Sequence, residues 1–197
     1  HLAMRTNLPV TNVERDFRDG ETIVSKTDLK GIITYVNPYF CEMSGFTEAE
    51  SLGQPHNFIR HPDMPPEAFA DLWATLRAGR SWTGLVKNRC KNGDHYWVQA
   101  NAAPIKEGRQ IVGYLSVRTK ASRTQIEDAS RLYQAMREGS AKHVAIRFGE
   151  VVRTGLAGRL ARLAALSLHT RLLVPLAILF ALLAGVGALS LLGIAGA

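Results

Sequence analysis

The sequence predicts an α+β fold: a five-stranded antiparallel sheet with short helices on one face, followed by a helical linker and a transmembrane segment. Strand-like runs rich in β-branched and aromatic residues occur in two groups, and short capped helices fill the stretch between them. The chain then ends in a long run without a charged side chain. We therefore divide it into an N-terminal cap or arm (residues 1–20), a globular domain (21–120), a helical basic linker (121–171) and a membrane anchor segment (172–197).

The first two predicted strands form a hairpin. Residues 21–26 and 32–36 have the composition of strands. The turn between them ends at Gly31, a residue that adopts positive φ without steric cost. Residues 1–20 are polar and show no periodic pattern, so we expect a cap or a flexible arm there.

Helical segments follow the hairpin. Asn37 and Pro38 mark the start of the first helix, with asparagine as the cap and proline in the first helical position, and Gly45 ends it. Residues 47–53 predict a second, shorter capped turn. Residues 66–78 predict a longer amphipathic helix. Its apolar stripe, which we expect in the core, consists of Phe69, Leu72, Trp73 and Leu76.

The stretch of residues 54–66 combines two histidines, an arginine and an aspartate with several prolines. Each proline fixes φ and removes a backbone donor, so we expect a short helical turn that leads into a rigid loop. Rigid presentation of Arg60, His61 and Asp63 suits the binding of an anion or a polar heterocycle. A solvated loop with an Arg60–Asp63 ion pair is the alternative.

Residues 82–89, 95–104 and 111–119 predict the remaining three strands, and Asn92-Gly93 is a strong hairpin signal between the first two. Side chains alternate along a strand, which places one set on the inward face of the first of these strands. This set consists of Trp82, Gly84, Val86 and Asn88. Gly84 would leave room for a ring between the indole and the amide. We expect the pocket between sheet and helices, and we expect His95 at the surface.

The net charge of +7 is concentrated in the linker. Residues 121–171 carry 9 Lys/Arg against 4 Asp/Glu, a difference of +5, whereas residues 1–120 carry 15 against 13, a difference of +2. A basic segment directly before an apolar run is typical of the cytoplasmic side of a membrane protein. The interleaved aromatics of a single-strand binder are missing, so we expect no nucleic-acid partner. Two cysteines without metal-site spacing indicate a reducing compartment.

Helical patterns extend through the linker over residues 125–137 and 144–168. Leucines at positions 156, 160, 163 and 166 stand beside arginines 159 and 162, which predicts an amphipathic segment at a membrane surface; a face for a partner helix is the alternative. Residues 172–197 would reach about 39 Å as a straight helix, beyond the ~30 Å of a bilayer core. We therefore expect a membrane anchor with its N-terminal side in the cytoplasm.

Several motifs resemble a known family. The strand–helix–strand order, with Asn37-Pro38 and Ser44-Gly45-Phe46, resembles the PAS sensor fold. The run of residues 53–70 is more specific, and together with residues 82–98 it resembles the sensor domain of bacterial aerotaxis receptors. The resemblance covers about residues 21–120, and the basic linker and the apolar run extend it.

The resemblance implies a function. Aerotaxis receptors bind FAD non-covalently in the PAS domain and report redox state, through HAMP and signalling domains, to a chemotaxis kinase. The resemblance therefore implies a homodimer at the bacterial inner membrane, with the PAS domain in the cytoplasm. The membrane anchor would span the membrane once or as a hairpin. The flavin-sensitive positions of the family correspond to Asn37, His56, Arg60, His61, Asp63, Trp82 and Asn88 in this sequence.

Physical chemistry allows these roles and leaves some open. Asn88 offers a donor and an acceptor, as the pyrimidine edge of a flavin requires, and Arg60 can bind a phosphate or a carbonyl oxygen. Trp82 can stack on the cofactor or be a plain core residue, and Asp63 can contact the ligand, cap a helix or orient Arg60. Light-sensing flavin PAS domains use a cysteine near the position of His56, where this chain has none, so we expect no thiol–flavin adduct.

Two other functions are the alternatives. A haem-based gas sensor on the same fold would use His56 or His61 as an axial ligand. An enzyme would need a nucleophile–base pair, a carboxylate pair or a metal cluster, and the sequence shows no such group. We therefore expect a sensor, with no catalytic or metal-binding residues.

Overall fold

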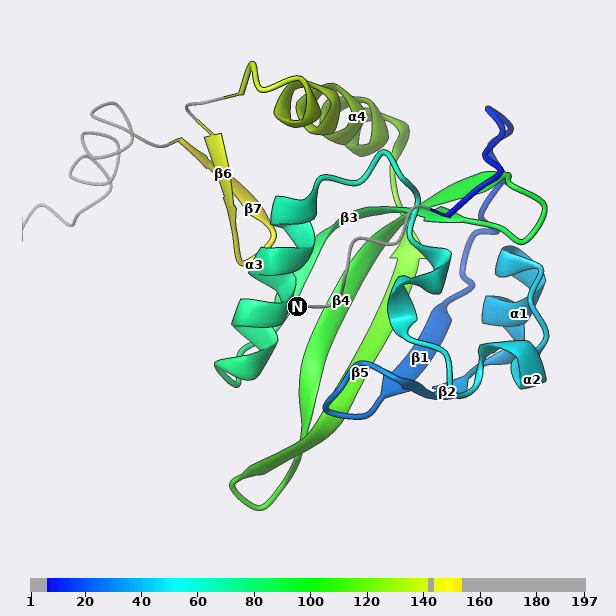
Figure 1. The fold of residues 1–197 in the computed structure, drawn as a ribbon, viewed down its shortest axis with the longest axis vertical. Coiled ribbons are helices and arrows are strands. Elements are labelled where there is room, and N and C mark those ends of the chain that lie inside the picture. The colour runs from blue at the N-terminus through cyan, green and yellow to red at the C-terminus, as the bar shows by residue number, and fades with distance from the viewer. Residues whose placement is uncertain (1–6, 142–143, 154–197) are drawn as a thin grey trace, which may run out of the picture. The chain divides into compact units, whose positions relative to one another are not determined.

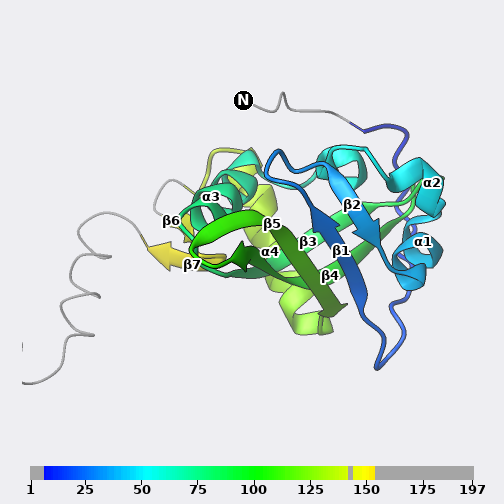
Figure 2. The same cartoon turned by 90° about the horizontal axis from the view of Figure 1, so that it is seen from below.

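The computed structural model describes residues 7–141 and 144–153 (Figure 1). The main sheet contains β1 (Ile23–Thr27), β2 (Ile33–Val36), β3 (Trp82–Arg89), β4 (His95–Glu107) and β5 (Gln110–Lys120). All neighbours are antiparallel, in the order β2-β1-β5-β4-β3. The first hairpin and the later meander therefore share one sheet, as predicted, because β1 pairs along its other edge with β5. Figure 2 shows the twist of this sheet from below.

The helical segments lie between β2 and β3 in the chain. They are α1 (Pro38–Ser44), α2 (Glu48–Ser51), the 3₁₀ turn η1 (His56–Ile59) and α3 (Pro66–Arg77). The predicted caps are present: Asn37 accepts from the backbone N–H of Phe40, and Gly45 ends α1 in the left-handed region. Thr47 and Glu50 form a capping box at α2.

The stretch that joins α2 to α3 covers both edges of the sheet. At the β2 edge, the backbone of Ile33 exchanges hydrogen bonds with Gly53 and Gln54, at 2.9 Å each. At the β3 edge, Arg60 pairs with Asn88 in an antiparallel bridge. Edge strands expose unpaired backbone groups that favour association with other chains, and here the same stretch covers part of both edges.

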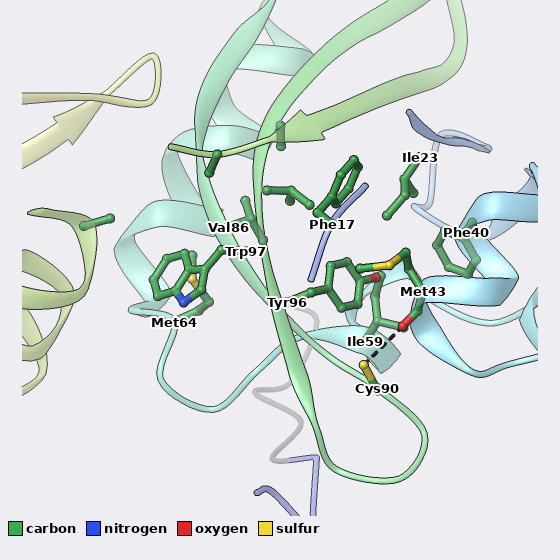
Figure 3. Close-up of a cluster of buried hydrophobic side chains, with 14 of the residues drawn as sticks. Phe17, Ile23, Phe40, Met43, Ile59, Met64, Val86, Cys90, Tyr96 and Trp97 are labelled. Atoms are coloured by element: carbon green, nitrogen blue, oxygen red, sulfur yellow. Dashed lines mark hydrogen bonds between the residues drawn. The ribbon is translucent and has the colours of Figure 1, made fainter. Parts of the chain in front are cut away.

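The main core lies between α1, η1 and the inward face of β4. Phe40 and Met43 of α1 point toward Ile59 and Tyr96 (Figure 3). Phe40 and Tyr96 are fully buried, at 0% exposure. Burial of side chains this large stabilises the fold by about 1.5–3 kcal/mol for each phenylalanine-sized group.

The N-terminal residues that the structure describes form a cap that packs on the domain. The backbone of Thr11 donates to Gly93 and that of Arg15 to His95, at 2.8 and 2.7 Å. The Asn7 side chain donates to the carbonyls of Asn57 and Arg60, both at 2.9 Å. The cap is therefore joined to the β3–β4 turn and to the loop that follows η1.

Beyond the sheet, the helix predicted over residues 125–137 is present. Helix α4 (Arg123–Arg137) begins at a capping box of Ser122 and Gln125. It lies against the opposite face of the sheet from α1, because Tyr133 stacks on Trp97, whose side chain alternates with inward-facing Tyr96. The Tyr133 hydroxyl donates to the Leu85 carbonyl at 2.7 Å.

The predicted helix over residues 144–168 is wrong at its start. Strands β6 (Val144–Arg147) and β7 (Glu150–Arg153) form a two-stranded hairpin there. Both residues of its turn have positive φ, 56° at Phe148 and 84° at Gly149, as a type I′ turn requires. Val144 and Ile146 alternate with the period of a strand, and the hairpin ends at Arg153, before the leucine pattern that suggested a helix.

Residues 154–197, which include the expected amphipathic segment and the membrane anchor, lie outside the described residues. Among the residues that the structure does describe, no helix combines the length and the apolar character needed to span a bilayer.

Candidate functional site

A cavity lies between the inward face of the sheet and the helical layer. Together with the open space at its mouth, it has a volume of about 770 Å³. Strands β1, β3, β4 and β5 line one side, and η1, Arg60 and α3 line the other. The lining residues are Ser25, Thr27, Gly31, His56, Asn57, Arg60, Phe69, Leu72, Trp73, Leu76, Val86, Asn88, Ala100, Ala102, Tyr114, Leu115, Ser116 and Arg118.

Buried polar atoms without a hydrogen-bond partner among the described residues gather on this cavity. Of eight such atoms, five belong to residues that line the cavity: Thr27 Oγ1, Asn57 Oδ1, Arg60 Nε, Asn88 Nδ2 and Arg118 Nη1; the other three are His61 Nε2, His95 Nδ1 and Tyr96 Oη. An unpaired buried polar group costs about 1–3 kcal/mol, so such atoms are rare and rarely cluster. The five at the cavity comprise three N–H donors and two oxygens, and are therefore complementary to a ligand that offers several acceptors and at least one donor.

Arg118 is the central cation of the site. It is 2% exposed, and its Nη2 donates to Ser25 Oγ at 3.1 Å and to His56 Nε2 at 2.5 Å. Burial and the charge of Arg118 hold the pKa of His56 well below its usual value, so this imidazole is neutral and its Nε2 accepts. Burial also lowers the pKa of Arg118 to about 10.

Arg60 supplies a second cation. Its guanidinium lies over the ring of Phe69, with Cζ 3.4 Å from the ring centroid, and burial lowers its pKa to about 10. Among the described residues, neither Arg60 nor Arg118 forms an ion pair with a carboxylate. Two cations without a counter-ion, Arg118 buried and Arg60 half-buried, make the cavity electropositive and suited to an anionic or carbonyl-rich ligand.

Three of the residues predicted from the sequence meet in the cavity: His56, Arg60 and Asn88. They come from η1, from the loop after it and from β3. Their proximity follows from the Arg60–Asn88 bridge, which brings the loop to the edge of β3. Val86 lines the cavity as well, as the predicted alternation of β3 requires.

Asn37 does not line the cavity. Its Oδ1 accepts from the backbone of Val24 and Phe40 at 2.9 and 3.1 Å, and its Nδ2 donates to the Thr22 carbonyl at 2.8 Å. All its hydrogen-bonding groups thus serve to join α1 to the start of β1.

Trp82 does not line the cavity either. It is 1% exposed, and its Nε1 donates to Asp71 Oδ2 on α3 at 2.8 Å. Its ring lies over Gly84, where an added Cβ would lie 2.5 Å from a ring carbon. The room that we expected at Gly84 for a ligand ring is therefore filled by the indole of Trp82 itself.

His61 and Asp63 form a cluster beside the cavity and not in it. His61 is 3% exposed, and its Nδ1 accepts from the Asp63 backbone at 3.1 Å. The Asp63 carboxylate pairs with Lys87 at 2.7 Å and not with Arg60, as the alternative interpretation of this loop would have required, and the Asp63 carbonyl accepts from Arg137 of α4. Burial and the charge of Lys87 lower the pKa of His61 to about 4. The loop thus joins the cavity wall to the helix on the other face.

Some expectations about other residues were wrong, and some site residues were missed. His95 is 7% exposed and packs edge-on to His61, so it is not a surface residue. Phe69 and Trp73 belong to the cavity wall as well as to the core. Arg118 was missed, although Tyr114, Ser116 and Arg118 alternate along β5 and therefore share a face.

Comparisons with known proteins agree with this architecture. Residues 33–118 match the family model described as the PAS fold. The chain is 48% identical to the aerotaxis receptor of Escherichia coli (strain K12) over 151 residues, which cover 77% of this chain and 30% of that receptor. It is 32% identical to a nitrogen fixation regulatory protein of Klebsiella pneumoniae over 82 residues, which cover 42% of this chain and 17% of that protein. The chain thus spans less than a third of the length of either relative.

A solved structure shares the fold at greater distance. A light-oxygen-voltage domain, described in a study with a flavin analogue, aligns with a TM-score of 0.50 and 24% sequence identity over 60% of this chain and 88% of that one.

The strand order, the helical layer over a cavity and the family match define a PAS sensor domain in this chain. It belongs among the PAS domains of aerotaxis receptors, and the resemblance that the sequence suggested is confirmed.

Proposed function

We propose that this chain is the flavin-binding sensor region of an aerotaxis receptor, which holds FAD non-covalently in the cavity and reports its redox state. The observation that carries the proposal is the convergence on one cavity of five unpaired polar atoms, two of which belong to the uncompensated cations Arg60 and Arg118. A core without a ligand would gain nothing from this arrangement and would lose stability at each unpaired atom.

The residues of the cavity fit an isoalloxazine ring. Its walls are largely apolar and aromatic, with Phe69, Leu72 and Trp73 of α3 facing the small side chains of β4. The Asn88 amide would hydrogen-bond the polar edge of the ring, and Arg60 and Arg118 would bind carbonyl or phosphate oxygens. Bound FAD would supply reversible electron transfer, whereas the protein binds it, orients it and sets the charge around it.

The other predicted residues would act through the structure around the cavity. Asn37 holds α1 against β1, and Trp82 fixes α3 through Asp71. His61 and Asp63 shape the loop that presents Arg60. We propose that substitutions at these positions affect the flavin by displacing its ligands and not by removing a contact.

The further domains, the partners, the oligomeric state and the location are proposed from relatives. The aerotaxis receptor that resembles this chain is longer, so the HAMP and signalling domains, the kinase complex, the homodimer and the inner-membrane location are proposed by analogy with the aerotaxis family. A sensory role, rather than a catalytic one, follows from the same analogy. A flavin analogue features in the description of a structure that shares this fold, so the fold is compatible with a flavin. Neither Cys41 nor Cys90 lines the cavity, which supports redox sensing without a thiol adduct.

The haem alternative has less support. His56 is the one histidine among the described residues that lines the cavity, and its Nε2 already accepts from Arg118. An axial ligand role would require this hydrogen bond to break and would bring the metal beside a buried cation.

The test is to purify the chain from cells and record its visible spectrum, then release the chromophore by denaturation and identify it by chromatography against FAD and FMN. The proposal predicts flavin bands and FAD as the released compound. A Soret band, or a protein that remains colourless after incubation with FAD, would contradict it.

A further inference from the structure

The carboxylate of Asp71 on α3 accepts three hydrogen bonds from two separate parts of the chain. Oδ2 accepts from Trp82 Nε1 and from the backbone N–H of Gly149, both at 2.8 Å, and Oδ1 accepts from the backbone N–H of Phe148 at 3.1 Å. Phe148 and Gly149 form the turn of the β6–β7 hairpin. One side chain thus holds the start of β3 and the tip of the hairpin together.

The hairpin turn packs closely against Asp71 and the start of β3. A Cβ at Gly149 would lie within bonding distance of the Thr83 carbonyl oxygen, so no larger residue can occupy this position. The guanidinium of Arg80 lies 4.3 Å from the centroid of the Phe148 ring. Figures 1 and 2 both show the hairpin beside α3. The turn therefore depends on α3 and the adjoining start of β3 for its position.

The other side of α3 forms a wall of the cavity. Phe69, Leu72, Trp73 and Leu76 all line it. Asp71 is two residues from Phe69, and hence on the opposite side of the helix. Any shift of α3 that accommodates a ligand would carry the Asp71 carboxylate with it, and the two turn amides bonded to that carboxylate.

We propose that Asp71 is a positioning residue that couples the α3 wall of the cavity to the β6–β7 hairpin, so that occupation of the cavity changes how firmly the hairpin is held. The hairpin is the last described element of the chain, which continues from Arg153 into the basic and apolar residues of the sequence. Anchoring by Asp71 holds for the chain with or without a ligand, whereas the coupling rests on the proposed flavin.

The experiment is hydrogen exchange followed by mass spectrometry on the full 197-residue chain, stripped of flavin and loaded with FAD. The variants are Asp71→Ala and Asp71→Asn, with Glu67→Ala as a matched control because Glu67 is an exposed carboxylate on the same helix. Trp82→Phe removes the hydrogen bond from the indole to Asp71 and leaves the hydrogen bonds from the turn amides. It therefore tests the contact of Asp71 with β3 separately from its contact with the hairpin.

In the stripped protein, Asp71→Ala should speed exchange in the peptide over residues 144–153 about tenfold, while Glu67→Ala and Trp82→Phe leave it near the wild-type rate. Loading with FAD should change exchange of this peptide in the wild type, and Asp71→Ala, compared at the same flavin occupancy, should abolish that change.

Unchanged hairpin exchange in Asp71→Ala, or a response to FAD equal to that of the wild type, would overturn the proposal. If Asp71→Ala speeds exchange in β1 to β5 as much as in the hairpin, the milder variant Asp71→Asn distinguishes the two explanations. Faster exchange of Asp71→Asn in the hairpin alone supports the proposal. Faster exchange of Asp71→Asn in both regions overturns it. A wild type that binds no FAD contradicts the proposed function, while the stripped-protein comparison still tests the anchor.

Discussion

At Asn88 the protein buries an amide nitrogen without giving it a partner. The side chain is 3% exposed and its Nδ2 is unpaired within the described residues. The cost of such an atom, about 1–3 kcal/mol, disappears either when a ligand accepts from it or when the amide is removed.

Asn88→Leu should therefore lower flavin retention strongly while it leaves the flavin-free protein as stable as the wild type, or more stable. The measurements are flavin occupancy after purification and the melting temperature of the stripped protein. A variant with wild-type occupancy would show that Asn88 does not bind the cofactor.

Arg118 lowers the pKa of the neighbouring His56, in addition to making the cavity electropositive. Its positive charge, 2.5 Å from His56 Nε2, adds to burial in lowering the pKa of this histidine. Arg118→Met removes the charge, so the pKa of His56 should rise toward its ordinary value of about 6.5 and FAD should bind more weakly.

Arg118→Lys is the matched control because it keeps the positive charge and loses the planar set of guanidinium N–H donors. It should keep the pKa of His56 low and still weaken FAD binding. The check is an NMR titration of the histidine ring protons in the stripped proteins. An equal pKa of His56 in the wild type and Arg118→Met would contradict the assigned interaction.

Only part of the site could be predicted residue by residue. His56, Arg60 and Asn88 were found because they lie in motifs that resemble a family. Arg118 lies in a strand whose alternation indicates an inward face, but charged residues are rarely placed inward, so the pattern argued against it. Its role depends on Ser25 and His56, which are distant in sequence and meet only in the fold.

At the scale of elements, α1 depends on one cap. Asn37 makes three hydrogen bonds, two from backbone amides to its oxygen and one from its amide to the Thr22 carbonyl. Asn37→Ala should destabilise the protein by about 2 kcal/mol, near the upper limit for the loss of a helix cap.

Asn37→Asp keeps the acceptor and loses the donor, so it should cost about half as much. Urea unfolding of the stripped proteins measures both values. If the two substitutions cost the same, the acceptor contacts with α1 and β1 contribute nothing and this account of the cap is wrong.

The loop after η1 should make stability depend on pH. Burial and the charge of Lys87 lower the pKa of His61 to about 4 in the folded protein, against about 6.5 when unfolded. Between these values the unfolded chain binds a proton that the folded chain does not, so stability falls as the pH is lowered through this range.

His61→Gln should flatten this dependence, while some slope remains because the pKa of His56 is lowered as well. Urea unfolding at several pH values between 4 and 7 tests it. A slope that the substitution leaves unchanged would mean that His61 is not the group responsible.

Elements were predicted well where caps and turns carry a local signal, and poorly where they do not. The caps of α1 and α2 and the Asn92-Gly93 turn are such signals. The β6–β7 hairpin was missed because its turn places phenylalanine, not asparagine, at positive φ. Contacts with Asp71 of α3 hold this turn, and a contact between distant residues leaves no trace in the local pattern.

At the scale of the whole molecule, the cavity is built by parts that are distant in the chain. Residues 53–61 cross from one sheet edge to the other, and the cap holds this stretch through Asn7. That the first hairpin and the later meander share one antiparallel sheet could be predicted from strand and turn patterns, because few arrangements satisfy them. Which polar atoms remain unpaired could not be predicted from the sequence, because the exposure and the partners of an atom are properties of the assembled fold alone.

We propose above all that this cavity is a flavin site. The most direct measurement is a calorimetric titration of the flavin-stripped chain with FAD, run in parallel on the wild type and on the double variant Asn88→Leu/Arg118→Met. We predict saturable binding of one FAD per chain in the wild type and affinity at least about a hundredfold weaker in the double variant, the factor expected when two buried polar contacts are lost. No binding to the wild type, or equal binding by both proteins, would contradict the claim.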